Sequence, residues 1–136
     1  MDLDAALHFV SENHRAVLVT RRRDGEPQLS PVIVTLDRDG RLVVSTRETA
    51  MKVHNIRRDP RVSVCVFDDG FFGPWVQVDG VAEVVPLPDA LDGLVEYYRS
   101  VSGEHPDWDD YRDAMTREKR VLVRVDPRRA GPSVSG

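Results

Sequence analysis

The sequence predicts one small domain that is mainly β with helices, built as a closed or split β-barrel of six strands. Six runs of β-forming residues are mostly separated by short connections, and helical patterns interrupt them at three points. A doubly wound α/β sheet requires strands that alternate regularly with helices, whereas only hairpin turns separate the first three strands here. The 136 residues suffice for one hydrophobic core and leave no room for a second domain.

The first third of the chain predicts a short helix followed by three antiparallel strands. Residues 3–10 place apolar side chains at helical spacing behind an acidic first turn. Turn signals at Asp24-Gly25 and at 37–40 join the strands, because glycine tolerates the positive φ of tight turns. The three strands are predicted over residues 16–21, 28–36 and 41–45.

The middle of the chain predicts one helix and two longer strands. The helix covers 49–59 and ends there because Pro60 disfavours α geometry in the residue before it. The strand over 61–68 is apolar on both faces, which indicates burial on both sides. The strand over 75–85 contains Gly80 at its centre, where we expect a bulge or a sharp bend.

The last third of the chain predicts two helices and a final strand. An apolar stripe at helical spacing follows Pro86 and ends near Gly103, and acidic residues open a short second helix at 107–112. The last strand is expected over 120–125. The prediction is therefore a single domain over residues 1–126 and a loosely ordered polar tail over residues 127–136.

Composition excludes several classes of partner. The chain carries 19 Lys and Arg against 23 Asp and Glu, a net charge of −4, so we expect no nucleic-acid partner. The acidic N-terminus and the lack of a long apolar run predict a cytoplasmic protein with no membrane contact. The single cysteine, Cys65, lies in an alternating apolar run and is expected to be an inert core thiol.

The sequence also lacks the common catalytic motifs. No glycine-rich phosphate loop, zinc-protease helix or hydrolase nucleophile elbow is present. The four histidines are scattered without a second ligand at suitable spacing, so we expect no metal site. The aspartates at positions 107, 109 and 110 suit a helix start better than acid-base chemistry.

One candidate binding segment is the basic stretch from Ser45 to Arg61. Hydroxyl and basic side chains surround the start of the predicted helix, and a helix N-terminus attracts anions. Lys52, in the first turn, adds a mobile charge. An equal alternative is a solvated helix face on which Arg57, Arg58 and Arg61 pair with neighbouring carboxylates.

A second candidate segment runs from Gln28 to Val34. Pro31 cannot donate to a strand ladder, so we expect an edge or a bulge whose free backbone groups can meet a planar ligand. Gln28 and Ser30 share one face of this strand with Val32, which places polar contacts beside an apolar wall. A structural bulge that binds no ligand is the alternative.

Taken together, these segments resemble the split-barrel flavin-binding family that includes pyridoxamine 5′-phosphate oxidase, and more closely its actinobacterial branch that uses coenzyme F420. The resemblance runs through nearly the whole chain and is carried by segments 25–32, 52–60, 75–80 and 103–112. It implies a six-stranded FMN-binding type of split β-barrel, a homodimer, and a cofactor in a groove between the two barrels.

The resemblance also implies which residues bind the cofactor. Lys52 resembles the phosphate-binding lysine of the family, although Ala50 stands where some relatives have arginine. Arg57 and Arg58 match contacts to the acidic tail of the cofactor, and the 45–47 segment matches the strand end near the phosphate. The full set of implied cofactor contacts is Gln28, Ser30, Pro31, Val32, Ser45, Thr46, Arg47, Lys52, Arg57, Arg58, Trp75 and Gln77.

The function implied is that of an F420-dependent oxidoreductase, which transfers a hydride between C5 of the deazaflavin and a small organic substrate. An FMN-dependent oxidase or reductase on the same fold, and a non-catalytic F420-binding protein, are the alternatives. No catalytic acid or base stands out, and the exposed aromatic loop with Phe71 and Phe72 is a candidate for choosing the substrate.

Overall fold

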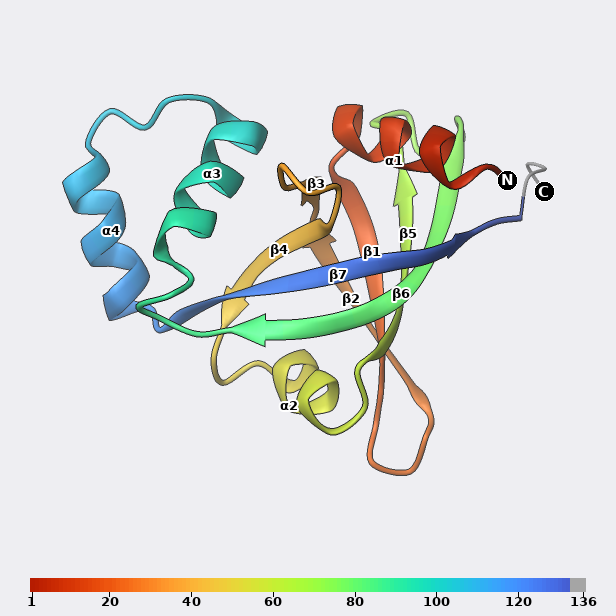
Figure 1. Ribbon diagram of the computed structural model, residues 1–136, viewed down its shortest axis with the longest axis horizontal. Helices are drawn as coiled ribbons and strands as arrows, with labels where there is room; N and C mark the ends of the chain where they lie inside the picture. Colours follow the sequence, from red (N-terminus) through yellow and green to blue (C-terminus); the bar gives the residue numbers. More distant parts are fainter. Residues whose placement is uncertain (133–136) are drawn as a thin grey trace.

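The computed structural model describes residues 1–132 as a strongly curled antiparallel sheet with helices around it (Figure 1). These residues form seven strands and four helices. The strands are β1 (Arg15–Arg21), β2 (Pro27–Ile33), β3 (Thr35–Leu36), β4 (Leu42–Arg47), β5 (Arg61–Phe67), β6 (Trp75–Val85) and β7 (Arg120–Ala130). The helices are α1 (Leu3–Glu12), α2 (Met51–Arg58), α3 (Leu91–Ser102) and α4 (Trp108–Arg117).

The sheet has the order β2-β1-β5-β6-β7-β4-β3, so the prediction of six strands is wrong by one. The run 28–36, expected as one strand, is two. The N–H of Val34 donates to the carbonyl of His14 at 2.8 Å, and the His14 Nδ1 lies 2.8 Å from the Val34 carbonyl. Because both backbone groups of Val34 bind His14 instead of a neighbouring strand, β2 ends before Val34 and β3 begins after it on a new partner, β4.

The sheet curls into a barrel that stays split between β2 and β4. β2 is one edge of the sheet, which accommodates Pro31 because an edge strand needs no second row of donors. The β3–β4 hairpin forms the other edge and lies near β2 without pairing to it. Figure 1 shows α1 and α2 at opposite ends of the curl, with α2 beneath the split.

The core is divided between the barrel and the helical end. Inside the curl, Leu18 and Val64 are fully buried together with Val10 of α1, which covers one end. A second cluster lies where α3 and α4 pack on β4 and β7, and it includes Leu94 and Leu122. The α3–α4 pair therefore has a core of its own and extends from one side of the barrel (Figure 1).

The β6–β7 pair is long and contains an irregularity at Gly80, where a bulge or a sharp bend was predicted. The ladder shifts register between Asp79 and Gly80, and a Cβ added at Gly80 would lie 2.3 Å from the carbonyl oxygen of Asp126. β7 continues past Val125 to Ala130 because β6 supplies pairing partners along this length. Residues 127–130 are thus paired strand where a loose tail was expected, and residues 133–136 lie outside the described residues.

Candidate functional site

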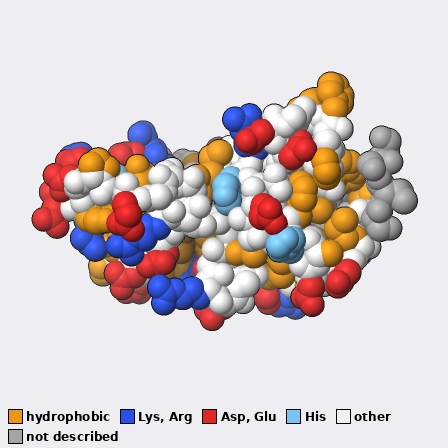
Figure 2. Space-filling view, turned by 90° about the horizontal axis from the view of Figure 1, so that it is seen from above, with side chains coloured by type: hydrophobic (Ala, Val, Ile, Leu, Met, Phe, Trp, Pro, Cys, Tyr) orange, Lys and Arg blue, Asp and Glu red, His pale blue; other side chains and the backbone are white. Residues whose placement is uncertain are grey.

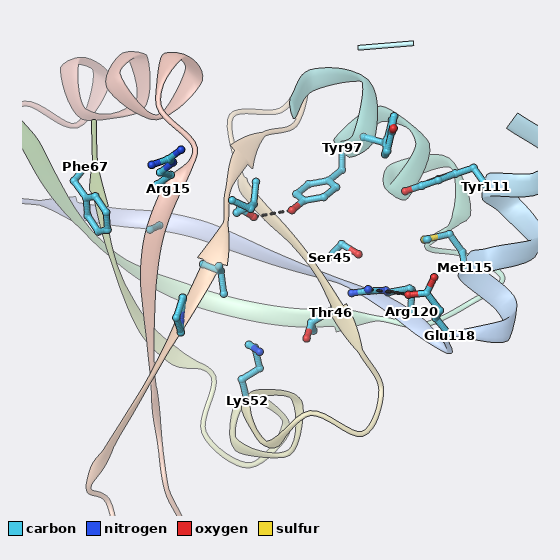
Figure 3. Close-up of a pocket in the computed structure, with 15 residues that line it drawn as sticks. Arg15, Ser45, Thr46, Lys52, Phe67, Tyr97, Tyr111, Met115, Glu118 and Arg120 are labelled. Atoms are coloured by element: carbon cyan, nitrogen blue, oxygen red, sulfur yellow. Dashed lines mark hydrogen bonds and ion pairs between the residues drawn. The ribbon is translucent and has the colours of Figure 1, made fainter. Parts of the chain in front are cut away.

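A cavity of about 810 Å³ lies in the split between β2 and β4 (Figure 3). β2 contributes an apolar edge through Pro31, Val32 and Ile33, and β4 contributes the polar side chains of Ser45 and Thr46. Helices α3 and α4 form an aromatic wall, while α2 and the start of β7 add charged groups. The cavity therefore combines an apolar strand edge, an aromatic wall and a charged floor, and an apolar pocket with a few polar groups is typical of a small-molecule site.

Lys52 rises from the first turn of α2 into this cavity (Figure 3). Its ammonium group is half-buried, and within residues 1–132 it forms no ion pair with a carboxylate. Burial lowers the pKa of Lys52, and the positive charge of Arg120 lowers it further. A desolvated cation without a counter-ion favours the binding of an anion at this point.

Arg120 supplies the second cation of the floor, and Glu118 is its partner. The guanidinium donates to one carboxylate oxygen of Glu118 from Nε at 3.1 Å and from Nη2 at 2.8 Å. Arg47 lies 3.5 Å from the same oxygen on the other side. Because of the hydrogen bonds from Arg120, the pKa of Glu118 is lowered, so the carboxylate is ionised at neutral pH.

Three tyrosines form the aromatic wall. The Tyr97 hydroxyl donates to the carbonyl of Ile33 at 2.8 Å, and the Tyr111 hydroxyl donates to the carbonyl of Leu94 at 2.8 Å. Tyr98 packs against Tyr111 with the two rings tilted by 58° and their centroids 5.0 Å apart. Burial raises the pKa of Tyr97 and raises that of Tyr111 to about 12, so both hydroxyls stay protonated near neutral pH.

The opposite end of the cavity leads to an aromatic loop. Phe67 lines the cavity, and the ring of Phe71 packs edge-on against the ring of Phe67 with the centroids 5.8 Å apart. The ring of Phe72 in turn packs on that of Phe71 with the centroids 5.0 Å apart. Phe72 is 94% exposed and Phe71 has a φ of 70°, unusual for a bulky residue. Hydrophobic side chains gather at this end, which carries α1 and the β5–β6 loop (Figure 2).

The structure brings some of the sequence-predicted site residues together and separates others. Five of them line the cavity: Pro31, Val32, Ser45, Thr46 and Lys52. Seven lie outside the lining: Gln28, Ser30, Arg47, Arg57, Arg58, Trp75 and Gln77. Of these, Arg57 forms an ion pair with Glu48.

Gln28 and Arg58 belong to a polar network around a buried asparagine. Asn55 is 2% exposed, and its Nδ2 donates to Gln28 Oε1 at 2.6 Å and to Thr20 Oγ1 at 3.1 Å. Arg58 Nη2 donates to Asn55 Oδ1 at 2.8 Å and to the carbonyl of Arg21 at 3.0 Å. The network fastens α2 to β1 and β2, and holds α2 in place beneath the split.

Sequence reasoning missed most of the aromatic and charged lining. The missed residues are Arg15, Ala16, Ile33, Phe67, Tyr97, Tyr98, Tyr111, Met115, Glu118 and Arg120. Tyr98 belongs to the apolar helical stripe that ends near Gly103, and the charged run 117–120 is a local signal for Glu118 and Arg120. Within residues 1–132, no three His, Cys, Asp or Glu side chains gather into a metal-binding group. No helix in that range combines the length and apolar composition needed to cross a bilayer.

Comparison with known proteins shows one family. The sequence profile described as pyridoxamine 5′-phosphate oxidase matches residues 3–132. A conserved hypothetical protein from Mycobacterium tuberculosis is 30% identical, with a TM-score of 0.79, over 100% of this chain and 93% of that chain.

Two further solved structures share the fold at lower identity. A protein named F420 reductase is 22% identical, with a TM-score of 0.70, over 91% of this chain and 94% of that chain. A haem storage protein from Vibrio cholerae is 16% identical, with a TM-score of 0.68, over 96% of this chain and 94% of that chain. At these identities the two matches establish the fold alone.

Proposed function

The chain belongs to the pyridoxamine 5′-phosphate oxidase family, and from that premise we propose that it is an oxidoreductase that uses coenzyme F420 to reduce a small organic substrate. Lys52 carries the proposal, because it is a half-buried cation without an ion pair within residues 1–132, beside an apolar strand edge and an aromatic wall. The similar structure named F420 reductase supports the choice of cofactor.

The side chains of the cavity fit the anionic part of a deazaflavin cofactor. Lys52 supplies the charge, and Ser45 and Thr46 supply hydroxyl donors at the neighbouring strand. Pro31 and Val32 offer an apolar edge against which a flat ring packs. When bound, the cofactor supplies hydride transfer at C5 of its ring.

The residues of the chain itself bind and orient the cofactor and the substrate, and they exclude water from the cavity. The raised pKa values of Tyr97 and Tyr111 keep both hydroxyls protonated at neutral pH, so neither acts there as a base. The carboxylate of Glu118 is held by arginine and ionised. We infer that solvent supplies any proton that the reduction requires, and that the cavity contributes orientation.

The proposed contacts outside the cavity take two roles. Arg57, Arg58 and Gln28 lie on α2 and the start of β2, and we assign them to the acidic tail of the cofactor. Trp75 and Gln77 lie on β6, and we assign them to a cofactor held against a second subunit. Ser30 and Arg47 complete the proposed set at the margins of the cavity.

A homodimer is part of the proposal, and the outer face of the sheet supports it. Paired residues Leu29 and Val19 point outward across β2 and β1, as do Phe67 and Trp75 across β5 and β6. These four apolar side chains are half-buried or exposed. They do not belong to the barrel core, because the opposite face of the sheet covers that core. Because Phe67 also lines the cavity, a second copy on this face would border the ligand site.

Sedimentation tests the dimer. We expect a mass of about twice 15.4 kDa at micromolar concentration. A clean monomer would contradict the proposed groove between subunits.

The cytoplasmic location is an expectation from the sequence that cell fractionation would check.

Fluorescence titration with the deazaflavin tests the cofactor. We expect submicromolar binding that Lys52→Ala abolishes, because the cavity then loses its unpaired cation. Arg117→Ala is the matched control, since Arg117 is exposed and does not line the cavity. A yellow preparation with bound FMN, or full binding by Lys52→Ala, would argue against the proposal.

Turnover separates an enzyme from a binding protein. The reduced cofactor should be oxidised at a measurable rate by at least one compound in a panel of quinones, enones and tetrapyrroles. Tight binding without turnover of any compound would favour the non-catalytic alternative.

A further inference from the structure

Two cations share the floor of the cavity, but only one of them has an anionic partner within residues 1–132. Lys52 reaches in from α2 and Arg120 from the start of β7 (Figure 3). Glu118 accepts two hydrogen bonds from Arg120, at 2.8 and 3.1 Å, and also lines the cavity. One internal carboxylate therefore occupies the place where an anionic ligand would meet the second cation.

Hydrogen bonds fix the backbone around Glu118, whereas within residues 1–132 its carboxylate is held by the side chains of Arg120 and Arg47. Lys119 adopts a left-handed φ of 53°, its N–H donates to the carbonyl of Thr116 at 3.2 Å, and its carbonyl accepts from Glu48 at 2.8 Å. The Glu118 side chain is about one-third exposed. Within residues 1–132, the Glu118 carboxylate makes no hydrogen bond to the backbone of the turn. The side chain can therefore rotate to another rotamer while the turn stays in place.

Arg47 offers Glu118 an alternative partner. Its Nη2 lies 3.5 Å from the same Glu118 oxygen that binds Arg120, and Arg47 is exposed outside the cavity. A carboxylate that moves toward Arg47 keeps a counter-ion, so leaving Arg120 does not strand its charge. After this move the cavity floor presents Lys52 and Arg120 together.

We propose that Glu118 is an internal competitor for the anion subsite, and that a phosphate-class anion displaces it from Arg120 to bind both Arg120 and Lys52. This rests on the proposed function only for the use of the cavity by an anionic cofactor. The exchange makes the cavity floor selective among anions, because a bound anion must compensate for the ion pair that is lost between Glu118 and Arg120. A ligand with two negative charges near each other meets both cations and is favoured over a singly charged one.

Binding of inorganic phosphate, followed by calorimetry or by amide chemical shifts, tests the competition. We expect Glu118→Gln to bind phosphate roughly 3- to 10-fold more tightly, because one nearby negative charge is removed. Arg120→Met should bind at least about tenfold more weakly, and Arg120→Lys should recover part of the loss. Unchanged or weaker binding by Glu118→Gln would overturn the proposal.

The double variant isolates the direct contact of Arg120 with the anion. With Glu118→Gln as background, adding Arg120→Met should still weaken phosphate binding, because the cation itself contacts the ligand. Equal affinity of the single and double variants would refute the contact. The matched control is the pair of Glu83 on β6 and Arg124 on β7, which lies outside the cavity and has a 3.1 Å hydrogen bond. Glu83→Gln should leave phosphate affinity unchanged. An equal gain in affinity for Glu83→Gln would mean that the effect of Glu118→Gln comes from the net charge of the protein and not from the cavity.

The same variants separate this inference from the proposed function. If phosphate binding follows the expected order but no deazaflavin binds, the competition stands and the cofactor proposal fails. If deazaflavin binds equally well to the wild type, Glu118→Gln and Arg120→Met, the cofactor proposal stands and the competition fails.

Discussion

The hydroxyl of Tyr97 donates a 2.8 Å hydrogen bond to the backbone carbonyl of Ile33, across the mouth of the split barrel. The bond joins α3 to the free edge of β2, where no further strand takes up the carbonyl. Buried Thr35 adds a second tie to α3 through Ser100, with the two hydroxyl oxygens 2.6 Å apart. The aromatic wall of the cavity is thus fastened to the strand that faces it, although its core belongs to the helical end.

Tyr97→Phe should weaken this connection. The variant loses one hydrogen bond and leaves the Ile33 carbonyl without its partner, so we expect a loss of about 1 kcal/mol in the free energy of unfolding. Urea denaturation measures it. Tyr98→Phe is the control, because the Tyr98 hydroxyl has no hydrogen bond within residues 1–132 and its loss should change stability by less than about 0.5 kcal/mol. Equal effects of the two variants would mean that the Tyr97 bond does not stabilise the wall.

Lys52→Met should stabilise the protein and abolish anion binding. The pKa of Lys52 is lowered mainly by burial, so at neutral pH the folded protein holds a charge that the unfolded chain solvates better. Removing this charge should raise the Tm by about 1 to 4 °C in a buffer without phosphate. Scanning calorimetry, with Arg117→Met as the exposed control, checks the direction. A lower Tm for Lys52→Met would show that the lysine stabilises the fold by itself.

Gly80→Ala should be strongly destabilising. The new methyl group would lie 2.3 Å from the Asp126 carbonyl, so β6 and β7 must separate at the bulge. We expect a loss of about 2 to 4 kcal/mol in chemical denaturation. Gly70→Ala is the control, because its nearest neighbour would lie 3.4 Å away. A mild Gly80→Ala variant would mean that the bulge relaxes easily.

Tyr111 should make stability fall at alkaline pH. Burial raises its pKa to about 12, above the value of 10.0 for a free phenol. A raised pKa of this kind contributes stability fully below pH 10, and the contribution is lost as the pH rises toward 12. Absorbance titration should show a tyrosine that ionises near pH 12 and is missing in Tyr111→Phe, and the variant should lose stability less steeply between pH 10 and 12. A profile identical to that of the wild type would contradict the assignment.

Local patterns predicted most of the fold because each depends on nearby residues. The β6 bounds at Trp75 and Val85 follow from β-forming residues between turn formers, and the end of α2 follows from Pro60. Pro31 lies on an edge strand, as its missing N–H requires. The break at Val34 escaped prediction because its cause is His14, twenty positions away in the chain.

The sequence by itself determined the mainly β class, most of the elements, an irregularity at Gly80 in the form of a bulge or a bend, and the basic stretch around Lys52 as a candidate binding segment. The tertiary structure alone decided what surrounds Lys52. Tyr97 and Arg120 reach the cavity from elements far along the chain, and only the curl of the sheet brings them to the split. The physical reason is range: a helix or turn follows from contacts within a few residues, whereas a cavity is the space left when distant elements pack.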